Sequence, residues 1–250
     1  MSVDIQPLLP SDAPEAARTL ARAFVTNPLN QAAFGPAALA RNEAFFRLGL
    51  SVMRGENFAA MEGSRILGVV HWVEAPACVF SPGQKLGMLP SMIRSLGLGS
   101  ALKLKKWLDA WEKLHPVERH LHLGPIGVSP EAQGRHIGHD LMKLYCAEAD
   151  RSNVLGYLET DRAENTVFYE RFGFETFATA SVLVSAPRPQ PAAPPRRSGA
   201  AAMSQHPTGE SPLRFTTDSA RRGRGRWTRR RCRSLCRPTA RARRPGRCPG

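Results

Sequence analysis

The segment from Val128 to residue 138 has the composition of an anion-binding loop. It reads Val-Ser-Pro-Glu-Ala-Gln-Gly-Arg-His-Ile-Gly, after an apolar run and before an amphipathic stretch. The first amides of a helix have no helical partner, and the helix dipole adds partial positive charge there. Gly134 and Gly138 let a ligand approach the backbone, and Arg135 adds a fixed positive charge. These residues fit a phosphate group, and an ordinary strand-to-helix turn explains them equally well.

A second polar constellation follows in the run Tyr-Leu-Glu-Thr-Asp-Arg-Ala-Glu-Asn-Thr-Val-Phe-Tyr-Glu-Arg-Phe-Gly-Phe, residues 157–174. The pattern predicts a strand, a polar turn and a short helix. Asn165 and Tyr169 are four residues apart, so they share one face of that helix. Taken alone, Asn165 would be interpreted as a capping or surface amide, and Tyr169 as a half-buried aromatic residue. Their presence beside the loop favours a ligand site.

Together these two segments resemble the GNAT superfamily of N-acetyltransferases. The loop is similar to the signature Gln/Arg-x-x-Gly-x-Gly/Ala, and the later helix is similar to Asn-x-x-x-Tyr-Glu-x-x-Gly-Phe. The resemblance covers residues 3–184 in the order of elements and is specific over 121–177. Within the superfamily, the chain is similar to the puromycin N-acetyltransferase-like branch. The resemblance implies an α/β GNAT (acyl-CoA N-acyltransferase) fold with a mixed central sheet and flanking helices.

The resemblance also implies a reaction. A primary amine of a small molecule would attack acetyl-CoA directly, without a metal, in a splay between the strand ending at Val128 and the strand 154–160. Backbone donors there would stabilise the oxyanion. The implied CoA-binding residues are Ile126, Gly127 and Val128 for the pantetheine arm and acetyl carbonyl, Gln133, Gly134, Arg135, His136, Ile137, Gly138 and His139 for the diphosphate, and Asn165 for the pantetheine region.

Two residues are expected to move protons in this reaction. Tyr169 would protonate the departing CoA thiolate, because a phenol is a neutral donor at pH 7. Glu159, at the end of a strand facing the cleft, would accept the proton of the amine, directly or through water. A solvated carboxylate, or one paired with Arg162, explains Glu159 equally well.

One residue departs from the family signature. His136 stands where the family usually has the first signature glycine. If that position requires a positive φ, a histidine costs about 1–2 kcal/mol. If only the amide must point at the phosphate, the side chain is tolerated beside the ligand.

Histidines are concentrated in one part of the chain. Five of the seven lie between residues 115 and 139, and His120 and His122 alternate on one face of a predicted strand. A zinc site is conceivable, but no cysteine or acid at ligand spacing accompanies them. Exposed histidines are therefore the favoured interpretation, and no metal is expected. Cys78 is expected to be a small buried apolar residue, because nothing suggests a base beside it.

Apolar periodicity places these residues on a series of elements. A capping box of Asp12 and Glu15 is predicted to open the first helix, and Leu39 and Phe46 are predicted to face inward from the second. The expected elements in chain order are a strand at 3–7, helices after residue 12 and at 37–54, a hairpin turning at 63–65, a helical region at 83–115, a strand at 119–128, a helix at 138–150, a strand at 154–160, a helix at 163–172 and a final strand.

The charge is unevenly distributed along the 250 residues. Residues 1–186 hold 18 Lys and Arg against 19 Asp and Glu, a net charge of −1, whereas residues 187–250 hold 17 Arg against two acids, a net charge of +15. We expect a GNAT domain at 1–186 and a disordered Arg/Pro-rich tail at 187–250. A shifted reading frame in a GC-rich gene would give this tail composition. The alternative is an Arg-rich nucleic-acid-binding protein with a non-catalytic CoA-binding core.

The remaining sequence features concern the setting of the protein. Two unclustered cysteines outside the tail do not form a disulfide framework, and no signal peptide is evident. No uncharged apolar run reaches the roughly 18–20 residues of a membrane span. We expect a cytoplasmic protein, monomeric or homodimeric, with no membrane partner and with nucleic acid as a partner only through the tail.

Overall fold

The computed structural model describes residues 2–113, 115–176 and 183. Within them, five strands form a mixed sheet in the order β1-β2-β3-β4-β5. The pairs β1–β2, β2–β3 and β3–β4 are antiparallel, and β5 runs parallel to β4. Their bounds are β1 Asp4–Pro7, β2 Glu56–Glu62, β3 Arg65–Glu74, β4 His120–Val128 and β5 Leu155–Leu158. The predicted α/β class with a mixed sheet is confirmed.

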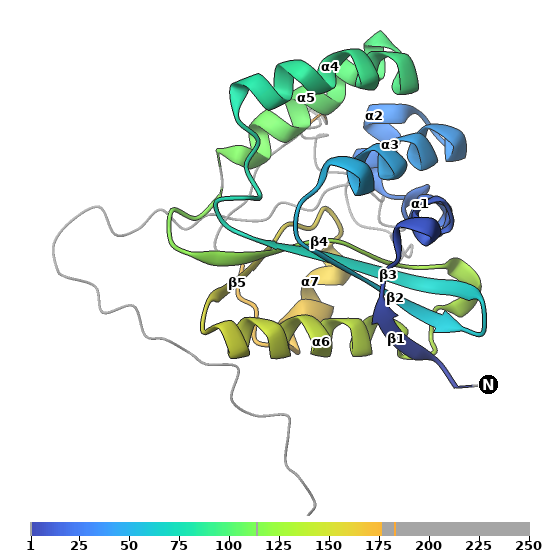
Figure 1. Cartoon of the computed structure of the whole chain (residues 1–250), viewed down its shortest axis with the longest axis vertical. Helices are drawn as coiled ribbons and strands as arrows, with labels where there is room; N and C mark the ends of the chain where they lie inside the picture. The colour runs from blue at the N-terminus through green and yellow to red at the C-terminus, as the bar shows by residue number, and fades with distance from the viewer. Residues whose placement is uncertain (1, 114, 177–182, 184–250) are drawn as a thin grey trace, which may run out of the picture.

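Helices cover both faces of this sheet (Figure 1). On one face lie α1 Ala13–Phe24, α2 Pro28–Phe34, α3 Leu39–Val52, α4 Pro82–Leu96 and α5 Leu98–Glu112. On the other lie α6 Ile137–Ser152 and α7 Ala163–Glu170. The predicted helical region 83–115 divides into α4 and α5 at Gly97, whose φ is 80°. The short helix α2 was not predicted, because seven residues carry too little periodicity.

Three apolar clusters hold the layers together. One joins the sheet to α6 and α7 and includes Leu141, Tyr145 and Tyr169. A second joins the sheet to α1 and α3. The third lies within the helix layer, among α2, α4 and α5, and includes Trp107. The last cluster shows that α4 and α5 are anchored by the other helices of their layer.

Two details of the predicted helices are wrong. Asp12 makes no side-chain cap at α1, because a 3₁₀ turn, Pro10–Asp12, precedes the helix and places Asp12 in a helical conformation. Glu15 instead accepts a hydrogen bond from the Ile66 amide, at 3.3 Å. Leu39 was expected to face inward, but it is exposed at the first turn of α3.

The strands β4 and β5 separate partway along their length. Residues 120–123 pair with residues 155–158, and β4 continues beyond them to Val128. The Tyr145 hydroxyl from α6 donates to the Leu121 carbonyl at 2.6 Å and accepts from the Tyr157 amide at 3.1 Å. The hydroxyl therefore bridges the two strands, in place of a direct hydrogen bond between this carbonyl and this amide. In the described part of the chain, residues 124–128 have no strand partner on this side.

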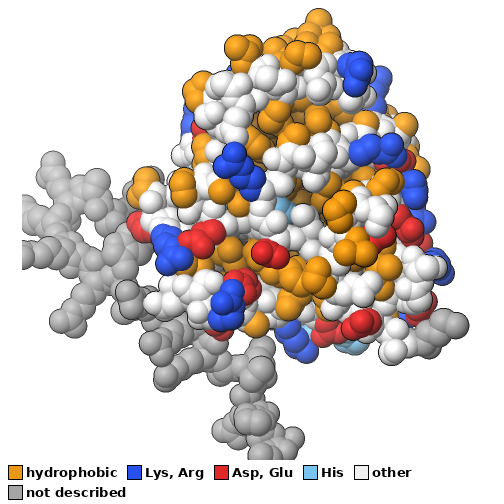
Figure 2. Space-filling model, viewed as in Figure 1, with side chains coloured by type: hydrophobic (Ala, Val, Ile, Leu, Met, Phe, Trp, Pro, Cys, Tyr) orange, Lys and Arg blue, Asp and Glu red, His pale blue; other side chains and the backbone are white. Residues whose placement is uncertain are grey.

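Some expectations fall outside the described residues. The predicted final strand after Gly173 lies mostly there, and residues 187–250, the predicted tail, lie there entirely. Among the described helices, none combines the length and the apolar character needed to span a bilayer. On the face shown in Figure 2, acidic and basic side chains are interspersed with apolar ones.

Candidate active site

The loop from β4 to α6 opens with a 3₁₀ turn, Pro130–Ala132, and ends at His136, the N-cap of α6. Gln133, Gly134, Arg135 and His136 are exposed, whereas the Ile137 side chain is buried in the core. No side chain caps α6, so the amides of Ile137, Gly138 and His139 lack helical acceptors. The predicted anion loop thus presents main-chain donors at the surface.

His136 adopts a left-handed conformation, with φ 62° and ψ 6°. A residue with a Cβ is strained here by about 1–2 kcal/mol relative to glycine. The departure from the family signature therefore falls at a position where the backbone favours glycine.

Arg135 is engaged by another side chain. Its guanidinium donates to Glu62 at the end of β2, at 2.6 Å. This hydrogen bond, together with the charge of Arg135, lowers the pKa of Glu62 although partial burial opposes it. Arg135 thus ties the loop to the β2–β3 hairpin, and an anion would have to share it with Glu62.

The residues Ile126, Gly127 and Val128 form the open edge of β4. The Ser129 amide donates to the Leu67 carbonyl of β3 at 2.8 Å. Because peptide groups alternate in an antiparallel pair, those of Ile126 and Val128 point away from β3, toward the unpaired side. Gln133 Nε2 reaches the Val128 carbonyl at 3.2 Å.

Gly127 has a different role, which is to allow close packing. A Cβ at this position would lie 3.0 Å from Leu20 Cδ2 and 3.0 Å from Phe24 Cε2 of α1. The absence of a side chain therefore lets α1 rest directly against the open part of β4.

Tyr169 lies on α7 in the core below the sheet. Its ring contacts those of Phe168 and Phe174. Burial, followed by the charge of Asp161, raises the pKa of Tyr169 to about 12. Among the described residues, none forms a hydrogen bond with its hydroxyl. Asn165 donates to Thr160 Oγ1 at 3.3 Å and so braces the turn before α7.

That turn is docked on the start of α2. Asp161 accepts from Asn27 Nδ2 at 2.6 Å and from the Leu29 amide at 3.0 Å. Arg162 donates to the carbonyl and the hydroxyl of Thr26, at 2.7 and 2.8 Å. Sequence reasoning missed these partners, which are more than 130 residues apart, and it offered an Arg162–Glu159 pair that does not form.

Glu159 lies within a buried cluster of histidines. Its Oε2 is 2.7 Å from His122 Nε2, and its Oε1 is 3.4 Å from His115 Nε2. Its side chain is only 11% exposed, so the alternative of a solvated carboxylate is wrong. Burial by itself would raise the pKa of Glu159, but the charge of His122 and hydrogen bonds from His122 and Tyr157 hold it below the usual value.

Cys78 belongs to the same cluster. Its Sγ lies 3.6 Å from His115 Nδ1 and 3.8 Å from His120 Nε2. Burial raises the pKa of Cys78, but the surrounding histidines outweigh it and lower the pKa to about 4. The expectation that no base lies beside Cys78 is wrong, because the histidines come from segments about 40 residues further along the chain.

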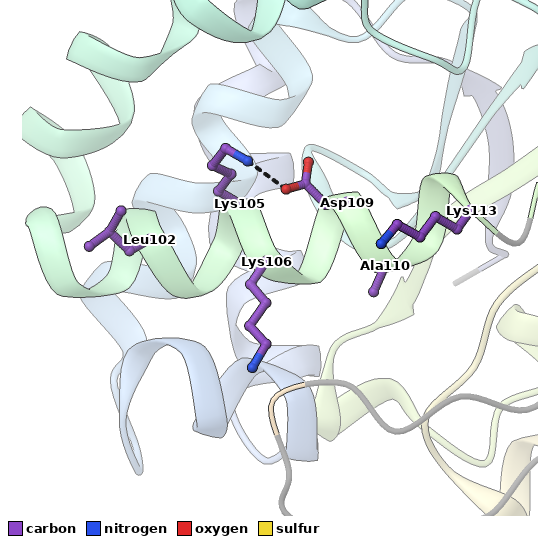
Figure 3. Close-up of a pocket in the computed structure, with 6 residues that line it drawn as sticks. All are labelled: Leu102, Lys105, Lys106, Asp109, Ala110 and Lys113. Carbon is purple, nitrogen blue, oxygen red and sulfur yellow. Dashed lines mark hydrogen bonds and ion pairs between the residues drawn. The ribbon is translucent and has the colours of Figure 1, made fainter.

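Two shallow hollows lie elsewhere, in the helix layer. One, of about 330 Å³, lies along α5, where Lys105 and Asp109 form an ion pair at 2.5 Å. Figure 3 shows the side chains that line it. The other, of about 310 Å³, lies between α2 and the start of α5. Neither is lined by the loop, the open edge of β4, or α7.

Comparison with known proteins agrees with this geometry. Residues 105–176 match the family model described as an acetyltransferase (GNAT) domain. This segment holds β4, the loop, α6, β5 and α7. The match supports the resemblance to a GNAT acetyltransferase over these residues, whereas the domain bounds 1–186 and the puromycin N-acetyltransferase-like branch stay predictions.

Several solved structures are similar over most of the described chain. One is a Corynebacterium glutamicum protein described as histone acetyltransferase HPA2 and related acetyltransferase, with 22% identity, a TM-score of 0.54, and coverage of 72% of this chain and 89% of its own. Another is an agmatine N-acetyltransferase in its apo form, with 16% identity, a TM-score of 0.54, and coverage of 76% and 95%. At these identities the likeness establishes the fold, which is the GNAT fold.

Proposed function

We propose that this chain is an acetyl-CoA-dependent N-acetyltransferase that acts on a primary amine of a small molecule. The observation that carries the proposal is the unpaired edge of β4 beside the uncapped start of α6. Both lie inside the segment that matches the acetyltransferase domain. Acetyl-CoA carries a thioester at one end and a diphosphate toward the other. The strand edge would bind the arm that carries the thioester, and the helix start would bind the diphosphate.

The diphosphate of acetyl-CoA would bind the loop amides. Around Gly134 nothing lies within 4 Å of the position of a Cβ, so its backbone is open to a bulky anion. Amides at a helix start are suited to such a group. Gln133, His136 and His139 border this position, and Asn165 would contact the pantetheine region.

The pantetheine arm would follow the open edge of β4. The peptide groups of Ile126 and Val128 would pair with its amides, as a neighbouring strand would. A main-chain amide aimed at the thioester carbonyl would stabilise the oxyanion formed when the amine attacks.

Tyr169 is proposed as the acid that protonates the departing thiolate. The raised pKa keeps its phenol neutral over the whole physiological range. Since no described residue competes for the hydroxyl, the proton is available to a sulfur placed between the two strands.

Glu159 is proposed as the base that accepts the proton of the amine, directly or through water. One of its oxygens is anchored by His122, and the other is buried without a hydrogen bond among the described residues. Leu121 and Leu123 pack against α6, so the alternating His122 faces the layer of α1 to α5. The acceptor amine would therefore enter from that layer, opposite α6.

The proposal is tested by titrating CoA into the full chain and by measuring release of free CoA thiol across a panel of small amines. We expect CoA binding without any amine, and thiol release that depends on the amine. Absence of CoA binding would refute the proposal. The nucleic-acid alternative depends on residues 187–250, and no observation favours it.

A further inference from the structure

Four sulfur- or nitrogen-bearing side chains converge where β3 ends and β4 begins. Cys78 comes from the turn after β3, His115 from the segment between α5 and β4, and His120 and His122 from β4 itself. The Cys78 sulfur and ring nitrogens of His115 and His122 all lie within 4.8 Å of one another. The side chains of His115 and His122 are 10% and 16% exposed, and His120 is buried.

We propose that Cys78, His115 and His122 bind a divalent metal ion of the zinc class. A thiolate with imidazoles is the donor set that zinc favours. Zn–S bonds of about 2.3 Å and Zn–N bonds of about 2.0 Å at tetrahedral angles place sulfur and nitrogen about 3.5 Å apart. The sulfur of Cys78 lies 3.6 Å from His115 Nδ1 and 3.8 Å from His120 Nε2.

The surroundings of the histidines have the form expected around a metal. A ligating histidine usually donates its other ring N–H to a carboxylate or a carbonyl, which fixes the ring. Glu159 Oε2 lies 2.7 Å from His122 Nε2, and its Oε1 lies 3.4 Å from His115 Nε2 without a hydrogen bond. The Glu118 carbonyl lies 2.8 Å from His120 Nδ1. The rings of His120 and His122 are thus each oriented by an oxygen.

The position of this site lets a bound ion hold two segments together. Three protein ligands leave the fourth position of a tetrahedral ion for a water molecule. The ion would tie the turn after β3 to the segment before β4, at the paired end of the β4–β5 splay. This inference does not depend on the proposed acetyl transfer, because it concerns the binding of an ion and can be tested without substrates.

The experiment uses the full chain without a polyhistidine tag. Cys232, Cys236 and Cys248, which lie in the Arg-rich segment and could bind zinc themselves, are replaced by serine in the background protein. This protein is equilibrated with Zn²⁺ and separated from excess metal. Its zinc content is then measured by inductively coupled plasma mass spectrometry. We expect about one zinc ion per chain.

The matched variants are Cys78→Ser, His115→Ala and, as the control, Cys146→Ser on α6. We expect zinc to be lost in the first two and kept in the control. With Co²⁺ in place of Zn²⁺, a thiolate-to-cobalt charge-transfer band should appear in the background protein and in Cys146→Ser, and be missing in Cys78→Ser.

A second measurement does not depend on variants that could misfold. Zinc should slow the alkylation of Cys78 in the background protein at least ~10-fold, since a metal-bound thiolate is a poor nucleophile. Peptide mapping identifies the alkylated residue. Equal alkylation of Cys78 with and without zinc, or zinc content unchanged in a folded Cys78→Ser variant, would overturn the site.

Discussion

At the residue scale, His136 and Tyr169 each combine an unusual environment with an expected role. His136 is exposed yet held at a positive φ, so its cost is one of backbone strain. Tyr169 is buried yet its hydroxyl is unclaimed among the described residues. Both properties can be measured with single substitutions that leave the surrounding packing in place.

Replacing His136 with glycine should stabilise the fold by about 0.5–1 kcal/mol. Glycine removes the strain of about 1–2 kcal/mol that a side chain has in the left-handed conformation. Part of this gain is offset because glycine loses more backbone entropy on folding. CoA should also bind more tightly, since the loop amides are then held without strain. Urea denaturation and isothermal titration measure the two effects. An unchanged or weakened CoA affinity would mean that the loop accommodates histidine without strain.

Neighbouring glycines in the loop are matched controls for this prediction. Gly134 has φ 80° and open space around it, so Gly134→Ala should destabilise the fold by about 1 kcal/mol through strain alone. Gly138 is not at a positive φ, and its Cβ would meet Val128 Cγ2 at 3.7 Å. Gly138→Ala should therefore be tolerated.

Replacing Tyr169 with phenylalanine should lower kcat by about 10²-fold or more, because a general acid contributes about 10²–10⁴-fold. The ring and its contacts remain, so CoA affinity should change little. Steady-state rates and CoA titration on the same preparation separate the two quantities. Near-normal turnover would remove the proton-donor role.

Tyr169 should also make stability depend on alkaline pH. Its pKa is raised in the fold, so the neutral phenol stabilises the native state below pH 10, and this contribution is lost as the pH rises toward 12. Relative to Tyr169→Phe, the native chain should lose up to about 1.4 kcal/mol per pH unit above pH 10. Urea denaturation of both proteins at pH 9 and pH 11 checks the difference. An equal pH dependence in the two proteins would contradict it.

At the element scale, the proposed CoA site depends on the splay between β4 and β5. Two strands that paired along their full length would leave no main-chain groups for a ligand. The Tyr145 hydroxyl stands between the Leu121 carbonyl and the Tyr157 amide. At this point α6 contributes a polar group to the sheet, between β4 and β5.

Replacing Tyr145 with phenylalanine should destabilise the fold by about 1–3 kcal/mol, because two buried strand groups lose their partner. CoA affinity should fall as well, since the strands can then move toward each other. The measurements are urea denaturation and CoA titration. Normal CoA affinity in Tyr145→Phe would show that the splay does not need the bridge.

At the scale of the whole molecule, the helix layer of α1 to α5 and the β5 end of the sheet are joined by a small set of polar contacts. Asp161 and Arg162 hold the start of α2 from the turn before α7. This is the side from which we propose that the acceptor enters. If the acceptor enters there, these contacts would set the distance between the helix layer and the bound thioester.

Replacing Asp161 with alanine should raise the KM for the acceptor amine several-fold, because α2 loses two hydrogen bonds to the site. CoA affinity should change little, since the loop and the β4 edge are untouched. Kinetics with varied amine, with CoA titration alongside, check this expectation. Equal losses of amine and CoA binding would point to general unfolding instead.

Local patterns in the sequence were enough for most of the fold and for part of the site. Hydrophobic periodicity and turn residues predicted the order of the elements and the loop before α6. They also predicted that Asn165 and Tyr169 share one helix face. Each of these features depends on neighbours a few residues apart. The tertiary structure decided what surrounds Glu159 and Cys78, the Tyr145 bridge and the Asp161 contacts. Those pairings join residues from 12 to 134 positions apart, so they follow from sheet register and packing, which local propensity does not encode.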